Sequence, residues 1–270
     1  MGIQKRQSPN RLLNRLLEEL PEGVAVPTAW LRDQGISPQL VRKYVKSGWL
    51  LSLAHGVYAR PVTPVNWQGI MLGLQRFLKF PLHIGGISAM NLQGLAHFLP
   101  LGGESRIHAW SHSQAPVRLP SWVEAVKHPQ TVIFHGQHLF DPAMRNEGLT
   151  TIGTQVRDWT LTVAMPERAI MEVLSLVDET PASFMHAVEL FEGLSVLRPS
   201  LVQELLAGCT SIKVKRIFLF LAKRQDYPWT RKLQTSRITL GRGKRLVTRG
   251  GRLDQNFFIT VPEDLIAHTG

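Results

Sequence analysis

The sequence holds a single cysteine, Cys209, among its 270 residues. An internal disulfide is therefore excluded, as are zinc sites built from several cysteines. No apolar run reaches the roughly 18 residues needed to cross a bilayer. The first twenty residues also lack the apolar run and small-residue cleavage site of a secretory signal. These absences favour a cytoplasmic protein with no membrane partner.

Acidic residues are scarce relative to basic ones. The chain has 31 Lys and Arg against 20 Asp and Glu, a formal net charge of +11. The excess lies at the two ends: residues 1–60 hold nine basic and four acidic residues, and residues 209–270 hold thirteen and four. Residues 151–208 instead hold three basic and eight acidic residues. This distribution predicts a polyanionic partner, with nucleic acid first among the candidates.

The first sixty residues predict three short helices followed by a β-hairpin. Apolar residues recur at helical spacing over residues 8–20, and Ser8-Pro9 is a good helix start. A second helix is expected from its cap at Thr28 to Gln34, and a third over residues 37–47, where Ser37 is the cap. Residues 49–60 then form two strands around a turn at 54–56. This order predicts a winged helix-turn-helix.

The third helix carries the strongest functional signal. Gln39, Arg42, Lys43 and Lys46 lie opposite its apolar stripe, where a recognition helix meets base edges and phosphates in the major groove. The alternatives are a winged helix that binds protein and an ordinary solvated basic face. The predicted DNA-contacting set is Thr28, Ser37, Gln39, Arg42, Lys43, Lys46, His55 and Arg60.

The remaining chain reads as a second, larger region. Helices are expected over residues 66–80 and 83–98. The latter is entered through Gly85-Gly86, where the backbone is expected to pack closely, and is capped by Ser88 or by the loop before it. Short strands are expected at 106–112, 122–127 and 131–136. A strand and four helices, beginning near residues 166, 181, 199 and 212, complete the pattern. The prediction is an α+β protein: a winged helix-turn-helix at 1–62, then a mixed α/β region at 65–270 with a candidate subdivision near 155–160.

Patterns typical of catalysis or metal binding are weak. Two histidine pairs invite a metal interpretation, His108 with His112 and His135 with His138. On a strand the i, i+4 pair shares a face, yet no carboxylate or cysteine stands at ligand spacing beside either pair. Metal-dependent nucleases need acidic clusters, and none has a convincing strand context. We therefore expect no metal, no cofactor and no enzymatic activity.

The C-terminal tail over residues 237–262 is rich in glycine and arginine and is expected to hold alternating β segments, and its basic part runs from Arg237 to Arg252. Three interpretations stay open: a second nucleic-acid surface, a docking face for an acidic protein, or a sheet edge kept soluble by charge. The residues that would form such a polyanion surface are Arg242, Lys244, Arg245, Arg249 and Arg252.

A series of segments, taken in order along the chain, resembles the AbiEi antitoxin family of bacterial type IV toxin–antitoxin and phage abortive-infection systems. The segments are GISPQLVRKYVKSGWL, GVYAR, HIGGISAMNLQGLAH, PERAIMEVL, VKRIFLFLA and LGRGKRLVTRGGRLDQNFFITVP. The resemblance implies a transcriptional autorepressor that binds inverted repeats in its own promoter. It also implies an antitoxin that opposes a nucleotidyltransferase-type toxin, directly or indirectly, with RNA as a further candidate partner. The alternatives are a nuclease targeted by the winged helix and a protein-interaction module.

Overall fold

The N-terminal elements combine three helices with a small antiparallel sheet. The computed structural model describes residues 9–96, 106–113 and 115–266, so Ser8 lies outside the described residues. The elements are α1 (Pro9–Glu19), β1 (Val26–Pro27), α2 (Thr28–Asp33), α3 (Pro38–Lys46), β2 (Leu51–Ala54) and β3 (Val57–Ala59). The sheet has the order β1-β3-β2. This arrangement is typical of winged helix-turn-helix domains. The two-residue strand β1 was not predicted, because it is too short to show alternation.

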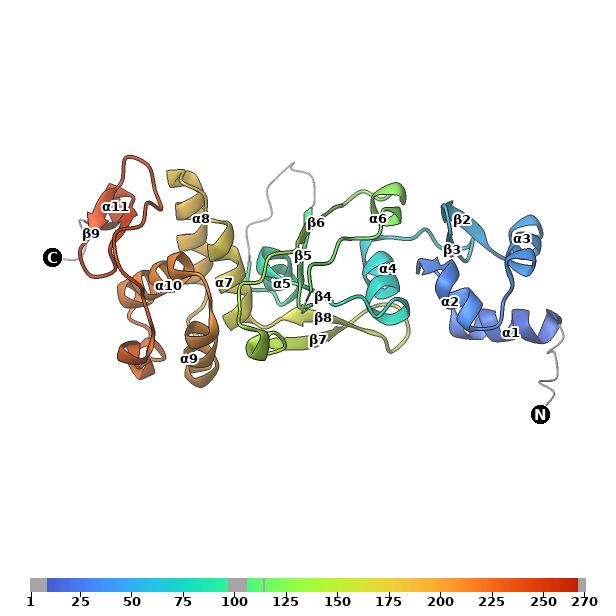
Figure 1. The fold of residues 1–270 in the computed structure, drawn as a ribbon, viewed down its shortest axis with the longest axis horizontal. Helices are drawn as coiled ribbons and strands as arrows, with labels where there is room; N and C mark the ends of the chain where they lie inside the picture. Colours follow the sequence, from blue (N-terminus) through green and yellow to red (C-terminus); the bar gives the residue numbers. More distant parts are fainter. Residues whose placement is uncertain (1–8, 97–105, 114, 267–270) are drawn as a thin grey trace.

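A five-stranded mixed sheet forms the middle of the elongated molecule (Figure 1). Its strands are β4 (Leu82–Ile84), β5 (Arg106–Ser111), β6 (Thr131–His135), β7 (Leu149–Gly153) and β8 (Thr160–Ala164). The order is β6-β5-β4-β8-β7, with parallel pairs β5–β6 and β4–β8 and antiparallel pairs β4–β5 and β7–β8. The centre of the sheet is therefore β4, a short buried strand.

Helices of the middle region pack on this sheet and on each other. They are α4 (Trp67–Leu72), the π-helical turn η1 (Gly73–Phe77), α5 (Gly86–Leu92), α6 (Trp122–Ala125), the 3₁₀ turn η2 (Pro142–Met144) and α7 (Pro166–Leu176). Helix α5 packs against α7 and β5, and α4 packs near β8. Mixed helices and strands around one core make the chain an α+β protein.

One prediction in this region was wrong and another held only in part. Residues 122–125 form a helical turn where a strand over residues 122–127 was expected. Trp122, Val123 and Val126 are all buried, an i, i+1, i+4 pattern that a helix produces and an alternating strand does not. The helix entry expected at Gly85-Gly86 is confirmed, since α5 begins at Gly86, but residues 82–84 belong to β4 and α5 ends at Leu92.

Ser88 is not the cap of α5. The cap position is Gly85, which has no side-chain cap. The Ser88 hydroxyl instead donates to the Arg106 carbonyl oxygen at 3.3 Å and accepts from the His108 backbone N–H at 2.9 Å. The side chain thus ties α5 to strand β5.

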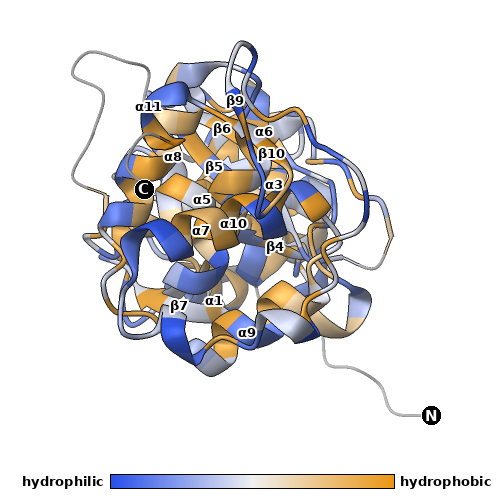
Figure 2. Cartoon of the chain, turned by 90° about the vertical axis from the view of Figure 1, so that its left-hand side faces the viewer, coloured by the Kyte–Doolittle hydropathy of each residue, from blue (hydrophilic) through white to orange (hydrophobic). Residues whose placement is uncertain are grey.

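The C-terminal elements are mainly helical. They are α8 (Pro181–Glu192), α9 (Pro199–Gly208), α10 (Ile212–Gln225), the 3₁₀ turns η3 (Thr230–Lys232) and η4 (Thr235–Arg237), β9 (Arg252–Asp254), β10 (Ile259–Val261) and α11 (Glu263–Ile266). In the end-on view of Figure 2, α7 and α10 lie near the centre and carry mostly hydrophobic residues. None of the described helices is long and apolar enough to cross a membrane.

The N-terminal elements, α1 to β3, pack directly on α4 and η1. The Ala25 backbone N–H donates to the Gly69 carbonyl oxygen at 3.3 Å. A Cβ atom at Gly69 would overlap with the Gly23 carbonyl, and one at Gly73 would overlap with the Ala25 carbonyl. The two glycines therefore allow backbone to approach backbone at this junction, which the sequence did not reveal.

Candidate nucleic-acid interface

Helix α3 presents one buried face and one basic face. Its first turn is fixed by Ser37, whose Oγ accepts a hydrogen bond from the Leu40 backbone N–H at 3.3 Å, and Pro38 occupies the first helical position. Val41 and Tyr44 are buried on the inner face. The outer face consists of four exposed residues: Gln39, Arg42, Lys43 and Lys46. The predicted cap and both predicted faces of this helix are confirmed.

No carboxylate of the described residues pairs with the cations of this basic face. The sequence has no acidic residue between Asp33 and Glu104, an interval that holds six Lys and Arg. Among the described residues, Arg42, Lys43 and Lys46 have no ion-pair partner. Neighbouring unpaired cations on an exposed helix face produce a positive potential that attracts phosphate.

Thr28 connects α2 to the tip of the hairpin. Its hydroxyl donates to the Gly56 carbonyl oxygen at 2.9 Å, and its backbone N–H donates to the same oxygen at 2.8 Å. The cap position of α2 is Pro27, which provides no side-chain cap, so the prediction that Thr28 caps this helix was wrong. The hydroxyl of Thr28 is used to hold the β2–β3 turn in place.

Among the described residues, the hairpin offers fewer unpaired cations than α3. His55 is exposed in the turn between β2 and β3. Arg60 lies at the end of the hairpin and forms an ion pair with Glu22 at 3.1 Å, which partly neutralises its charge. Trp49 and Leu51 are about half exposed at the start of the hairpin. Of the predicted DNA-contacting residues, those on α3 are therefore the ones with fully available charge.

The second basic surface is held in place by a buried arginine. Arg216 on α10 is only 2% exposed. It donates to the carbonyl oxygens of Leu240 at 2.8 Å, Gly243 at 2.6 Å and Phe258 at 3.2 Å. These bonds fix the loop before β9 to the β9–β10 hairpin. Because a guanidinium carries five donors, one side chain can satisfy several loop carbonyls.

The basic segment, residues 242–252, runs along this frame. All five predicted polyanion-binding residues are exposed: Arg242, Lys244, Arg245, Arg249 and Arg252. Arg249 is not free, because its guanidinium pairs with the Glu179 carboxylate. Residues 241–250 form no named strand, so the predicted alternating β segments are limited to β9 and β10. The segment is an exposed loop whose backbone is fixed from beneath.

A buried charged cluster, which the sequence reading missed, lies between β4 and α7. The Glu172 carboxylate accepts hydrogen bonds from His83 Nε2 at 2.7 Å, from the Gly86 backbone N–H at 2.9 Å and from Arg168 Nε at 2.9 Å. All three side chains are buried. A Cβ atom at Gly85 would overlap with the carboxylate. The predicted close packing at Gly85-Gly86 is confirmed, and its cause is Glu172.

The protonation states of this cluster follow from its contacts. Burial alone would raise the pKa of Glu172, but His83 and Arg168 outweigh it and the pKa is lowered. Burial lowers the pKa of His83. At neutral pH the cluster is therefore a carboxylate between a cation and a neutral imidazole. The Nδ1 atom of His83 has no hydrogen-bond partner among the described residues.

The strand histidines pair differently from their spacing in sequence. His108 Nδ1 lies 2.9 Å from His135 Nε2, and both rings stack with Trp110. His112 stacks on His83 at a centroid distance of 5.7 Å. Burial is the main cause that lowers the pKa of His112 and of His135 to about 4. In the described part of the chain, no three His, Cys, Asp or Glu residues form a group that could hold a metal ion.

Family models divide this chain into two matching parts. Residues 104–262 match the model described as "Transcriptional regulator, AbiEi antitoxin, Type IV TA system", and residues 9–101 match that of the AbiEi antitoxin N-terminal domain. The chain belongs to the AbiEi antitoxin family. The resemblance inferred from the sequence segments is confirmed, and with it a role as a transcriptional regulator and antitoxin of a type IV toxin–antitoxin system.

One solved structure places this AbiEi family member among known folds. The RV2827C protein from Mycobacterium tuberculosis is similar to it with a TM-score of 0.56 and 15% sequence identity, over 98% of this chain and 96% of the other. At this identity the likeness concerns the fold alone. None of the curated proteins matches.

The family description names a transcriptional regulator, and patterns typical of catalysis are weak in the sequence. The lone thiol is also ill suited to nucleophilic chemistry in this AbiEi protein: Cys209 is buried, and burial raises its pKa to about 11. The charged cluster that the sequence reading missed did leave one signal. Arg168 and Glu172 stand at i, i+4 on an otherwise apolar part of α7, a spacing that predicts a buried ion pair.

Proposed function

We propose that this protein is a DNA-binding autorepressor whose helix α3 enters the major groove of inverted repeats in its own promoter. The proposal rests on one observation: the outer face of α3 carries three cations, none of which has an acidic partner among the described residues. The helix also follows α2 through a tight turn at Gly35, which has a φ of +78°. We propose that the winged helix at residues 1–62 is the DNA-binding unit, and that residues 65–270 carry the antitoxin function.

The exposed residues of α3 suit two kinds of DNA contact, with base edges and with phosphates. Ser37 and Gln39 stand at the N-terminal end of the helix, where contacts with base edges concentrate. Arg42 has the bidentate geometry that recognises guanine. Lys43 and Lys46 suit phosphate contacts, which contribute affinity and its salt dependence.

The experiment is a titration of the protein against its own upstream DNA and a scrambled duplex at two salt concentrations. Wild type is expected to bind the upstream DNA more tightly. The variant Arg42→Ala/Lys43→Ala should lose this selective binding, and each lost phosphate contact should lower the slope of log K against log salt by about one.

A matched control separates a local effect from the loss of net charge. Arg118→Ala/Lys127→Ala removes two exposed cations from another part of the chain and should leave the selective binding unchanged. Thermal melting should show that both variants remain folded. Wild-type affinity in the α3 variant would refute the assignment of the recognition helix.

For the antitoxin function we propose that the C-terminal region opposes a nucleotidyltransferase-type toxin, either by contact or through a shared nucleic-acid or nucleotide target. The exposed basic segment supports a polyanionic target, since four of its five predicted cations have no ion-pair partner among the described residues. The buried Arg216 supports this further, because it fixes the segment's backbone and so lowers the entropy lost on binding.

A further inference from the structure

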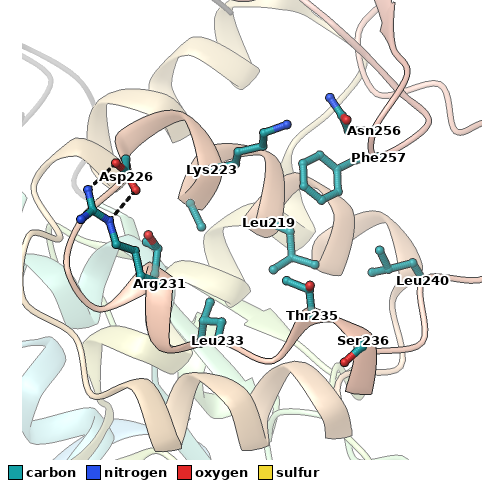
Figure 3. Close-up of a pocket in the computed structure, with 12 residues that line it drawn as sticks. Leu219, Lys223, Asp226, Arg231, Leu233, Thr235, Ser236, Leu240, Asn256 and Phe257 are labelled. Atoms are coloured by element: carbon teal, nitrogen blue, oxygen red, sulfur yellow. Dashed lines mark hydrogen bonds and ion pairs between the residues drawn. The ribbon is translucent and has the colours of Figure 1, made fainter.

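A pocket of about 570 Å³ lies beside the C-terminal half of α10. Its apolar lining comes from Leu219, Ala222, Leu233 and Leu240, and the ring of Phe257 stands at one side. Figure 3 shows Leu219 near the centre of this group, with the Asp226–Arg231 pair at one end and Phe257 and Leu240 toward the other. We call this cavity the α10 pocket. Its volume is in the range of small-ligand sites, roughly 300–1,000 Å³.

Polar groups with unused hydrogen-bonding capacity surround the apolar lining. The side chains of Lys223, Thr235, Ser236 and Asn256 line the pocket and form no side-chain hydrogen bond or ion pair among the described residues. The one carboxylate in the lining, Asp226, accepts two hydrogen bonds from Arg231, at 2.6 and 3.0 Å. The pocket therefore offers donors, an acceptor amide and a free ammonium group, and its negative charge is neutralised.

The α10 pocket shares residues with the contacts that anchor the basic segment. Leu240 lines the pocket, and its carbonyl oxygen accepts the hydrogen bond from Arg216 that fixes the segment. Phe257 precedes Phe258, whose carbonyl oxygen accepts from the same guanidinium. The region from residue 209 onward carries thirteen basic and four acidic residues. A ligand seated in the pocket would thus lie beside the loop that leads into the basic segment.

We infer that the α10 pocket binds one unstacked nucleotide, with its base against Phe257 and its phosphate on Lys223. An apolar cavity with an aromatic wall accepts a base, because stacking needs only a π face and little sequence information. Hydroxyl and amide groups at the rim can pair with base edges or sugar hydroxyls. An apolar side chain of a protein partner would instead leave the rim groups and Lys223 without partners. The inference deepens the proposed antitoxin function and rests on it.

The test measures binding of a fluorescent single-stranded oligoribonucleotide, a duplex RNA of equal length and the four nucleoside triphosphates to the full chain. We expect the single strand to bind more tightly than the duplex. Phe257→Ala should weaken single-strand binding about 10-fold or more, with a smaller effect on the duplex. Phe257→Trp should restore it, because it restores the stacking surface. Competition by a free triphosphate would identify a mononucleotide as the ligand, and its failure would identify an RNA strand.

Two matched controls are present in the chain. Phe258→Ala removes a neighbouring aromatic ring that is 45% exposed and does not line the pocket. Lys232→Ala removes an exposed cation outside the pocket and is compared with Lys223→Ala. Both controls should bind the single strand within about 3-fold of wild type, whereas Lys223→Ala should lose about 5-fold or more and show a smaller salt slope.

The outcomes separate this inference from the proposed function. If Phe257→Ala and Lys223→Ala bind as wild type while Arg242→Ala/Lys244→Ala does not, the basic segment binds RNA and the pocket does not. If wild type binds no RNA and no nucleotide, the inference is overturned and the pocket is left to an apolar side chain of a protein. In either case, titration of the same preparations against promoter DNA reports on the autorepressor function independently.

Discussion

Glu172 offers a sharp test of how the middle region is held together. Its side chain is fully buried and accepts three hydrogen bonds, from His83, the Gly86 backbone and Arg168. The variant Glu172→Ala removes all three acceptor contacts at once. Arg168 keeps its bonds to the carbonyl oxygens of Arg145 and Glu147, but its charge then lies buried without a carboxylate.

The expected cost follows from that buried charge. Breaking a buried ion pair by removing one partner costs about 3–5 kcal/mol of unfolding free energy. For a chain of this size each kcal/mol lowers the thermal midpoint by roughly 2–4 °C. We therefore expect Glu172→Ala to melt roughly 10 °C below wild type. Circular dichroism should measure the melting, and hydrogen exchange of the β4 and α5 amides should locate the loss of stability.

A double variant distinguishes a lost ion pair from a lost volume. Arg168→Met alone should also be strongly destabilising, because it leaves the Glu172 carboxylate buried with only the neutral His83 and one amide. Glu172→Gln and Arg168→Met, made singly and together, form a double-mutant cycle. The double variant should be less destabilising than the sum of those two single effects. The exposed pair of Arg249 with Glu179 is the control, and Glu179→Ala should cost under about 1 kcal/mol. A Glu172→Ala midpoint within about 2 °C of wild type would refute this reasoning.

Two further predictions concern the junction and acid stability. Gly69→Ala should destabilise the junction by about 1–3 kcal/mol, because its Cβ would overlap with backbone that cannot rotate away. Limited proteolysis should detect this as faster cleavage. The control Gly153→Ala, which has no atom within 4 Å of the added Cβ, should behave as wild type. The free energy of unfolding should fall as the pH is lowered from 7 to 5. The pKa values of His112 and His135 are about 4 in the folded chain and near 6.5 in the unfolded chain. The unfolded chain therefore binds more protons in this window, and acid favours it. After discounting for partial exposure we expect about 1 kcal/mol from each; a flat pH profile of urea midpoints, or one that His135→Gln does not change, would contradict this.

The N-terminal elements, α1 to β3, were largely predictable because their signals are local. Ser37 caps a helix through an atom three residues away, and Pro38 and Gly48 mark its two ends in the sequence itself. The basic face of α3 follows from the same periodicity. The hairpin was predictable for a similar reason, since its two strands are separated by only a two-residue turn.

Features that depend on distant contacts were missed or wrong. His83 and Glu172 are 89 residues apart, and nothing in either local segment announces the other. The strand expected at residues 122–127 failed because a short apolar segment fits either period, and burial against the rest of the fold decided for a helix. Thr28 looked like a cap, but tertiary structure used its hydroxyl for the hairpin tip.

The glycine pair at the junction bears on how modular this protein is. Gly69 and Gly73 contact backbone atoms of residues 23–25. The packing of the N-terminal elements on α4 and η1 therefore involves main chain as well as side chains. An N-terminal domain taken from a relative and joined at the exposed residues 61–64 would have a different backbone conformation at the positions of residues 23–25. That backbone need not fit against Gly69 and Gly73. Domain exchange between relatives should therefore succeed only when residues 23–25 and the helix over 67–77 are transferred together.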